Sequence, residues 1–222
     1  DEEIFGNLER EAIANEQYTD WQKEILRTGF QQDHQLGITA ANENTRFALS
    51  ANFFEQEGIT REQGFDRYTT SISVDHTIGR LQVGAKGSAT RSSQKTGPGN
   101  GVWGLALANH HLGTPYDDNG FLKPKANDDP LLINPLIAIY ENITENQRNR
   151  TFGSFFADYQ LTDGLSVRST SGPDLIRTTQ GNFQSRNARN NSPASASKGE
   201  DETFAYTWTN LANFNREVGA HR

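Results

Sequence analysis

Few groups of residues in this sequence have the types and spacing that binding or catalysis needs. In Tyr116–Gly120 two Asp residues and one Asn supply adjacent oxygens, as a hard cation such as calcium prefers. The later Glu that completes an EF-hand loop is missing, however, and an Asn-Gly pair is also a common β-hairpin turn. We therefore favour a plain turn there, and Asn127–Pro130 and Gly172–Asp174 are most simply turns as well.

A zinc site could be built around the adjacent pair His110 and His111. Neighbouring side chains diverge on both helices and strands, and the sequence contains neither Cys nor a His-Glu-x-x-His motif. Ser192, Ser195 and Ser197 lie in a stretch rich in Ser, Asn, Ala and Gly, which is typical of a loop rather than of a catalytic nucleophile. No acidic pair has a spacing that suits glycoside hydrolysis. We expect no metal, no cofactor and no enzymatic activity.

Composition excludes further classes of protein. The formal net charge is -7 and the Lys and Arg residues are scattered, whereas nucleic-acid binding needs basic patches opposite the phosphates. No apolar run approaches the roughly 18 residues of a transmembrane helix. Only 33% of the residues are hydrophobic and 20 are Gly, which is little for the core of a water-soluble protein of this length. The scattered basic residues therefore predict no nucleic acid as a partner, and the low apolar content argues against a large water-soluble core.

The elements that must position these side chains are strands, because apolar and polar residues alternate with a period of two. The predicted strands are Gln35–Ala41, Thr45–Glu55, Arg67–His76, Leu81–Thr90, 153–161, a weaker one from Leu165, and Thr203–Asn215. One face of each strand is apolar and includes aromatic residues. The other face is small and polar but carries Arg46, Arg67, Asp75 and Lys86. The pattern predicts an all-β fold with two chemically different faces.

The connections between these strands alternate between short turns and long segments. The turns are Ala41–Asn44, Thr77–Arg80 and Leu161–Gly164, and the long segments are Glu55–Gly64, Gln94–Arg150 and Gly172–Glu202. In an up-and-down antiparallel meander every second connection lies at the same end of the sheet. One end therefore carries short turns and the other carries long loops, which is typical of a transmembrane β-barrel with periplasmic turns and extracellular loops.

Two soluble alternatives remain open on the residues alone. A carbohydrate-binding or adhesive β-sandwich also alternates, because one face is buried and one is wet, and Trp103, His110, His111 and Tyr116 would then line a sugar platform. A β-rich hydrolase would need an acidic pair that we do not find. The connections favour the barrel, because sandwich loops are seldom so long at one end only.

Several motifs, in order, resemble one family. Tyr18–Gly29 reads Y-T-D-W-Q-K-E-I-L-R-T-G, which is similar to the N-T-D-W-Q-D-x-I-F-R-T-G stretch of the SusC/RagA-like, TonB-linked outer-membrane transporters of Bacteroidota. His34–Phe47 is similar to their H-N-L-S-V-S-G-G-N-E-K-T-R-Y hairpin, with Ala40-Ala41 where the family often has two glycines. Asn52–Ile59 and Phe65–Tyr68 follow as counterparts of G-Y-F-x-Q-E-G-I and F-x-R-Y.

The resemblance implies both a fold and a function. Proteins of this family have an N-terminal plug, a segment that contacts TonB and a barrel of about 22 strands. They import oligosaccharides, peptides and other large nutrients, with a SusD-like surface lipoprotein as partner. This chain shows about seven strand patterns and neither plug nor TonB box, and an open sheet would leave edges that lipid does not tolerate. We therefore expect residues 1–222 to be an internal piece of one such barrel, which crosses the cell outer membrane several times and contacts TonB through its missing N-terminal part.

These expectations assign the two faces of the wall. Arg46, Arg67, Asp75 and Lys86 are expected to face the lumen. The positions expected to face outer-membrane lipid are Leu36, Ile38, Phe47, Leu49, Ile72, Val74, Val83, Phe155, Tyr159, Tyr206 and Trp208.

The longest loop, Gln94–Arg150, is expected to be ordered. Its apolar residues could form a small core, and they are Trp103, Leu105, Leu107, Leu112, Leu131, Leu132, Ile133, Leu136 and Ile137. A loop with its own core is more often functional than disordered, so we expect it to fold over the barrel mouth, with Trp103, His110 and Tyr116 in contact with substrate or partner. The alternative is a loop that is ordered only by its neighbours.

Overall fold

A computed structural model describes residues 5–99 and 101–215. Seven strands form one sheet in chain order, and each strand pairs antiparallel with the next. The strands are β1 (Gln31–Ala41), β2 (Thr45–Glu57), β3 (Gly64–Ile78), β4 (Leu81–Lys95), β5 (Asn142–Thr162), β6 (Leu165–Gln184) and β7 (Ser195–Phe214). The prediction of an all-β, up-and-down antiparallel segment is confirmed. Within the described residues the strands make a single sheet, not the two packed sheets of a sandwich.

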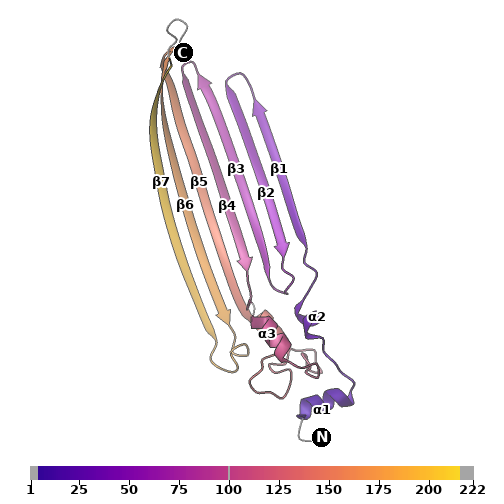
Figure 1. Cartoon of the computed structure of the whole chain (residues 1–222). Coiled ribbons are helices and arrows are strands. Elements are labelled where there is room, and N and C mark those ends of the chain that lie inside the picture. The colour runs from indigo at the N-terminus through magenta and orange to yellow at the C-terminus, as the bar shows by residue number, and fades with distance from the viewer. Residues whose placement is uncertain (1–4, 100, 216–222) are drawn as a thin grey trace.

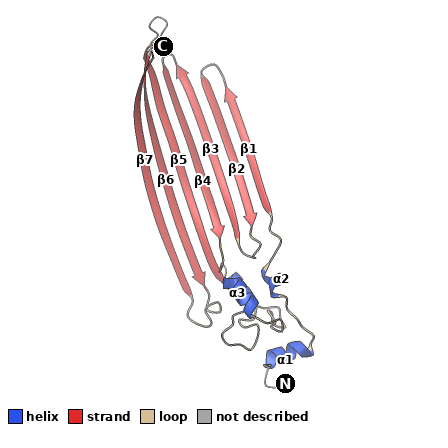
Figure 2. Ribbon diagram, in the orientation of Figure 1, coloured by secondary structure: helices blue, strands red, loops and turns tan. Residues whose placement is uncertain are grey.

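The sheet is long and gently curved, with different connections at its two ends. The short turns β1–β2, β3–β4 and β5–β6 lie at one end, which is uppermost in Figure 1, and the helices gather at the other. Figure 2 shows the same separation, with helices confined to the lower end. The predicted division into a short-turned end and a long-looped end is therefore confirmed.

Local chemistry explains the tight turns. The side-chain oxygen of Asn42 accepts hydrogen bonds from the backbone N–H groups of Asn44 (3.0 Å) and Thr45 (2.7 Å), which closes the β1–β2 turn. At the β3–β4 turn Gly79 has a φ of 57°, in the left-handed region where glycine is not penalised. Both turns are short enough to keep the adjoining strands in register.

Two of the predicted loops have wrong bounds, because the strands on either side of them are longer than expected. β5 begins at Asn142, so the end of the predicted loop Gln94–Arg150 is strand, and β4 runs on to Lys95. β6 extends to Gln184 and β7 starts at Ser195, so most of Gly172–Glu202 is also strand. Most of these added strand residues are polar, and their few apolar residues do not alternate regularly, so the period-two signal is lost there although the backbone still pairs.

Gly172–Asp174 lies inside β6 and is not a turn. Proline is rare in a central strand because it cannot donate a backbone hydrogen bond. Here Pro173 lies beside Gly153 of β5, where a Cβ would come within 3.3 Å of the Pro173 ring. The absent side chain at Gly153 leaves the room that the proline ring occupies.

The buried core lies at the looped end and not in the sheet. Four helices are described there: α1 (Asn7–Ala14), α2 (Trp21–Ile25), α3 (Gly101–Ala108) and α4 (Pro135–Glu141). The core cluster consists of Trp21, Ile25, Val102, Ala106, Ala126, Leu136 and Ile139. None of the described helices is long and apolar enough to cross a membrane.

Candidate functional site

The strand register sorts the side chains of the sheet onto two faces. Residues paired across an antiparallel ladder point to the same side. Leu49, for example, pairs with Ile38 and with Ile72, while Arg46 pairs with Asp75. Followed strand by strand, the register places all eleven positions predicted to face lipid on one face, and all four predicted lumen positions on the other. We call these the apolar face and the polar face.

The apolar face forms a band of limited height. On β7 it runs from Phe204 to Phe214, and at about 3.3 Å per residue with a strand tilt of about 40° this spans roughly 25 Å. Large apolar side chains in the band are exposed, with Leu36 68% and Trp208 66% accessible. Between the band and the helical end the same face carries Arg177, which forms ion pairs with Glu200 and Glu202 at 3.1 and 2.8 Å. On β7 the apolar run thus stops before the strand does.

The polar face is held together by its own pairs. Arg150 binds both carboxylate oxygens of Asp174, at 2.9 and 2.6 Å. The hydroxyl of Ser71 donates to that of Ser88 at 3.1 Å. Three guanidinium groups stack on phenyl rings: Arg67 on Phe54, Arg150 on Phe152 and Arg168 on Phe156, at 5.4, 5.9 and 4.0 Å. Cation–π contacts of this kind keep phenylalanines on a face that is otherwise polar.

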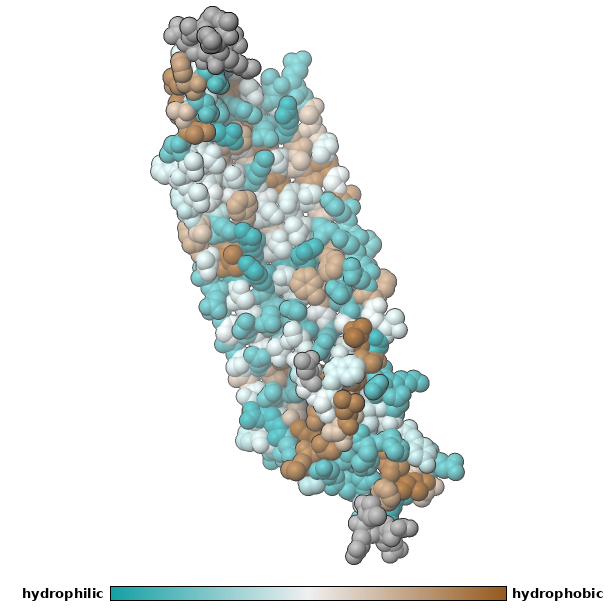
Figure 3. All heavy atoms as spheres, in the orientation of Figure 1, coloured by the Kyte–Doolittle hydropathy of each residue, from teal (hydrophilic) through white to brown (hydrophobic). Residues whose placement is uncertain are grey.

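These phenylalanines are residues that sequence reasoning missed, because only the register reveals the arginine beside each ring. On the side of the molecule seen in Figure 3, hydrophilic residues dominate along the strands and apolar ones gather at the helical end. The sheet therefore combines a polar, charge-paired face with an apolar one, and the helical end adds a third surface.

The segment 96–141 and the N-terminal helices form an ordered cap at the looped end. The side-chain amide of Asn134 donates to the carbonyl oxygens of Pro115 and Lys123, both at 2.8 Å, and its oxygen accepts from the N–H of Leu136 at 3.0 Å. The indole N–H of Trp21 donates to the carbonyl of His110 at 2.9 Å. The Trp21 bond connects the segment to α2, and the Asn134 bonds connect distant parts of the segment to one another.

The predicted loop core is only partly right. Leu112, Leu136 and Ile137 are buried as expected, but Leu107 and Leu131 are 70% and 79% exposed. Trp103 packs from the side against the core, which also takes in Trp21 and Ile25 from outside the loop. The loop therefore has a core, but it shares that core with α2.

The residues chosen as substrate or partner contacts do not form one group. Trp103 lies on α3. The ring of His110 lies 3.1 Å from the carboxylate of Glu9, and the ring of His111 stacks on Tyr18 at 5.8 Å. Tyr116 opens the small hairpin that is bridged to Leu122, where burial, and then the charge of Glu24, raise the pKa of its phenol. Among the described residues no hydrogen bond, ion pair or ring contact joins any two of Trp103, His110 and Tyr116.

In that hairpin Asp117 acts as a turn residue. Its carboxylate accepts the backbone N–H groups of Asn119 and Phe121, at 3.0 and 2.8 Å. Gly120 has a φ of 81°, as an Asn-Gly turn requires. The plain-turn interpretation of Tyr116–Gly120 is confirmed.

A carboxyl pair fastens α1 to the cap. Glu9 is buried and accepts the backbone N–H of Asp128 at 3.2 Å, while Asp128 accepts the N–H of Leu8 at 2.7 Å. Burial, together with a hydrogen bond to Glu9, raises the pKa of Asp128. Burial also opposes ionisation of Glu9, but hydrogen bonds from Asp128 bring the pKa of Glu9 below its usual value. Of the two carboxyl groups, Asp128 is therefore the one that takes up a proton first as the pH falls.

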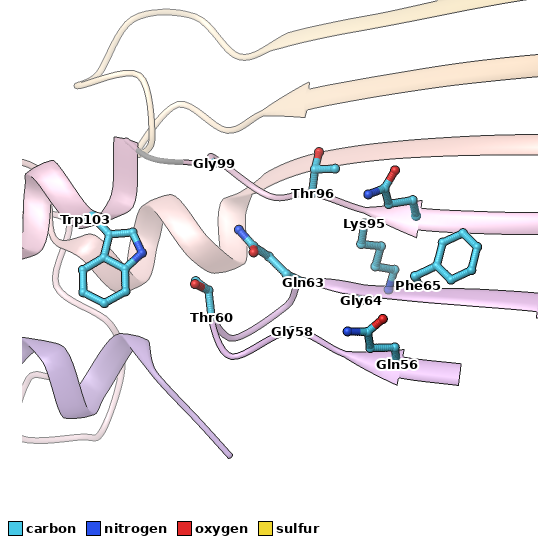
Figure 4. A pocket seen from close by; sticks show the side chains of 11 residues that line it. Gln56, Gly58, Thr60, Gln63, Gly64, Phe65, Lys95, Thr96, Gly99 and Trp103 are labelled. Atoms are coloured by element: carbon cyan, nitrogen blue, oxygen red, sulfur yellow. The ribbon is translucent and has the colours of Figure 1, made fainter. Parts of the chain in front are cut away.

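A cavity of about 330 Å³ opens where the cap meets the polar face. Figure 4 shows it between the ends of β2, β3 and β4, the β2–β3 turn and Trp103 of α3. The residues that line it include Gln56, Thr60, Gln63, Phe65, Gln94, Lys95, Thr96 and Trp103. Of the three predicted contact residues, Trp103 is the one that this cavity includes.

Comparison with known proteins gives consistent relatives, although no family model matches the chain. TonB-dependent receptor P3 of Formosa agariphila is 28% identical over 220 residues, which cover 91% of this chain and 21% of the receptor. TonB-dependent receptor P26 of the same organism is 29% identical over 160 residues, 70% of this chain and 16% of the receptor. TonB-dependent receptor SusC of Bacteroides thetaiotaomicron is 32% identical over 56 residues, 25% of this chain and 6% of SusC.

Solved structures show the same fold. A chain in the structure of the RagAB peptide transporter superposes with a TM-score of 0.73 and 20% identity, over 91% of this chain and 24% of that chain. The chain is thus similar in sequence to TonB-dependent receptors and in fold to part of a RagAB chain. The resemblance carried by the sequence motifs is thereby confirmed. The chain spans only 21% and 16% of the length of the first two relatives, both of which are named TonB-dependent receptors.

Proposed function

We propose that this segment forms part of the wall of an outer-membrane barrel that imports a large nutrient, an oligosaccharide or a peptide, in a TonB-dependent manner. The observation that carries the proposal is the two-faced sheet. An exposed apolar band of roughly 25 Å matches the hydrocarbon layer that bacterial barrels span. The polar face opposite, with Arg46, Arg67, Asp75 and Lys86, then lines a hydrated lumen, and no enzymatic step is needed.

The orientation follows from the two ends of the sheet. In such barrels the short turns face the periplasm and the long loops face the cell exterior. The turns at Asn42 and Gly79 would then be periplasmic, and the cap and the β6–β7 connection extracellular. The strand ends between the apolar band and the cap would extend the wall out of the membrane, which fits the largely polar residues that β7 carries there.

The cap is the proposed contact surface for a SusD-like lipoprotein. Leu107, Phe121 and Leu131 are 70%, 71% and 79% exposed there, and exposed apolar side chains in a cluster of loops commonly mark an interface. The likeness in fold to a chain of the RagAB peptide transporter, together with the SusC relative, supports a partner for this segment as well. His110 and Tyr116 remain proposed contacts because both are accessible: the side chain of His110 is 45% exposed, and Tyr116 as a whole is 43% exposed.

Site-directed labelling of the complete transporter tests the topology, because this segment contains no Cys. Single cysteines are placed at Glu43 in a short turn and at Ser192 in the β6–β7 connection, in an otherwise cysteine-free transporter. A membrane-impermeant maleimide should label Ser192→Cys on intact cells and Glu43→Cys only after the outer membrane is opened. Labelling of Glu43→Cys on intact cells would contradict the proposed orientation.

The partner surface has a separate test. Leu107→Arg and Leu131→Arg should reduce co-purification of the lipoprotein with the transporter, whereas Ser192→Arg, on the exposed β6–β7 connection outside the cap, adds the same single charge and serves as the matched control. Because both leucines are largely exposed, the fold should survive the substitutions. Unchanged co-purification in the double variant would refute a partner contact through these residues.

A further inference from the structure

The cavity at the junction of cap and wall has the chemistry of a binding site for one class of ligand. Gln56, Phe65 and Gln94 pair across β2, β3 and β4, so they form one row on the polar face. Thr60 and Gln63 of the β2–β3 turn and Trp103 of α3 close the other side (Figure 4). In the proposed orientation this is the lumen side of the extracellular rim.

The cavity is built on a fixed turn. The guanidinium of Arg27 donates to the carbonyl oxygens of Gly58 (3.1 Å) and Gln63 (3.0 Å) and forms an ion pair with Glu57 (3.3 Å). The N–H of Gly58 donates to the carbonyl of Gln63 at 2.8 Å, which closes the turn. The backbone that presents Gln63 is therefore held on both sides before any ligand arrives.

The lining amides have spare hydrogen-bonding capacity. The side chains of Gln56, Gln63 and Gln94 make no hydrogen bond to any described residue, whereas Gln32 and Gln147 elsewhere on the sheet both do. Each carboxamide offers two donors and an acceptor. Adjacent sugar hydroxyls, which both donate and accept, match that set.

The charge and shape of the cavity narrow the ligand further. Among the described residues that line the cavity, Lys95 alone is charged, and none of them is a carboxylate that could meet the amino terminus or basic side chains of a peptide. Trp103 and Phe65 offer aromatic surface on which the C–H face of a sugar ring can pack. A volume of about 330 Å³ is at the lower end for ligand sites and suits a single small ring system.

We propose that this cavity binds one neutral sugar unit of an oligosaccharide. The inference rests on the proposed import function and specifies its substrate class. Gln56, Gln63 and Gln94 hydrogen-bond the hydroxyls, and Trp103 packs against the ring.

Calorimetric titration of the complete purified transporter tests the site. The probes are three neutral hexasaccharides (maltohexaose, laminarihexaose and xylohexaose), anionic tetragalacturonate and a tryptic digest of casein. We expect at least one neutral hexasaccharide to bind, and Gln63→Ala and Gln94→Ala each to weaken it about 5- to 10-fold, as the loss of one hydrogen bond does. Trp103→Phe, which keeps an aromatic ring against the core, should weaken it less.

Two variants serve as controls. Gln180→Ala removes a glutamine from the same cross-strand row, two strands beyond Gln94 and outside the cavity, and should leave the affinity unchanged. Lys95→Gln removes the charge but keeps a polar side chain, and it should change neutral binding less than about twofold, since a neutral ligand does not need the charge. A large loss with Lys95→Gln, or binding of tetragalacturonate or peptides alone, would overturn the assignment to a neutral sugar.

Uptake assays separate this site from the wider proposal. If cells import a substrate through the transporter but the glutamine variants bind every probe as the parent does, the sugar site is wrong and the import function stands. If the parent transporter imports neither sugars nor peptides in a TonB-dependent manner, the import function itself fails.

Discussion

Replacing Leu49 by arginine tests the assignment of the two faces most directly. Leu49 lies at mid-height of the apolar face, between Ile38 and Ile72 on the neighbouring strands. If that face meets lipid, an arginine there must bring its charge into the hydrocarbon layer. Such a substitution at the midplane of a barrel costs about 2–4 kcal/mol, and a cost of 3 kcal/mol lowers the folding equilibrium constant on the order of 150-fold.

Ser50→Arg is the matched control one residue further along β2. Ser50 pairs with Gly37 and Ser71 on the polar face, and its diagonal neighbours Gln35, Thr39, Thr69 and Ser73 carry no charge. An arginine there would not meet lipid, and no charged residue pairs with it directly or diagonally, so we expect a change within about 1 kcal/mol. The two variants differ by one position in the chain and by the face they occupy.

The measurement is reversible unfolding of the complete transporter barrel in lipid vesicles by guanidinium chloride. Leu49→Arg should lower the transition midpoint clearly and Ser50→Arg should not. Equal loss in the two variants would mean that both faces are buried in protein. Greater loss in Ser50→Arg would reverse the assignment of the faces and refute the barrel orientation.

Three further outcomes follow from the cap. Asp128→Asn should keep α1 docked as pH rises. Because the pKa of Asp128 is raised, its contribution to the docking of α1 is complete below about pH 4 and is lost as pH climbs through the folded-state pKa. Hydrogen exchange of α1, measured against pH in parent and variant, checks this. The lowered pKa of Glu9 has the opposite sign, so Glu9→Gln should weaken docking chiefly above pH 4 in the same assay. Asn134→Ala should destabilise the cap by roughly 2–4 kcal/mol through three lost hydrogen bonds, seen as faster exchange around α4, while Asn119→Ala should not.

The sequence was sufficient for the features that depend on neighbouring residues. The faces of β2 and β3 could be predicted because period-two alternation records which side of a strand is apolar. The turn at Asn42 could be predicted because an Asn side chain can bond the backbone two residues on. In both cases the physical cause lies within a few residues of its effect.

The features that depend on distant residues could not be predicted. The N-terminal half of β5 is largely polar on both faces, so only its pairing partners in β4 and β6 identify it as strand. Pro173 has the composition of a turn, and it is accommodated in β6 because Gly153 lies beside it. Phe156 looks misplaced on a polar face until Arg168, brought by the next strand, stacks on it at 4.0 Å.

The cap shows why its contact residues were the hardest to predict. Trp103 and His110 are near in sequence, yet Trp103 faces the β2–β3 turn while His110 meets Glu9, about a hundred positions earlier in the chain. That division is set by Trp21 and Ile25 of α2, which enter the core of the loop from the segment directly before β1. Because Arg27 follows α2 and binds the β2–β3 turn, the same short segment anchors both the cap and one wall of the cavity. Displacing α2 should therefore disturb the loop core and the cavity together, although the two are far apart in the sequence.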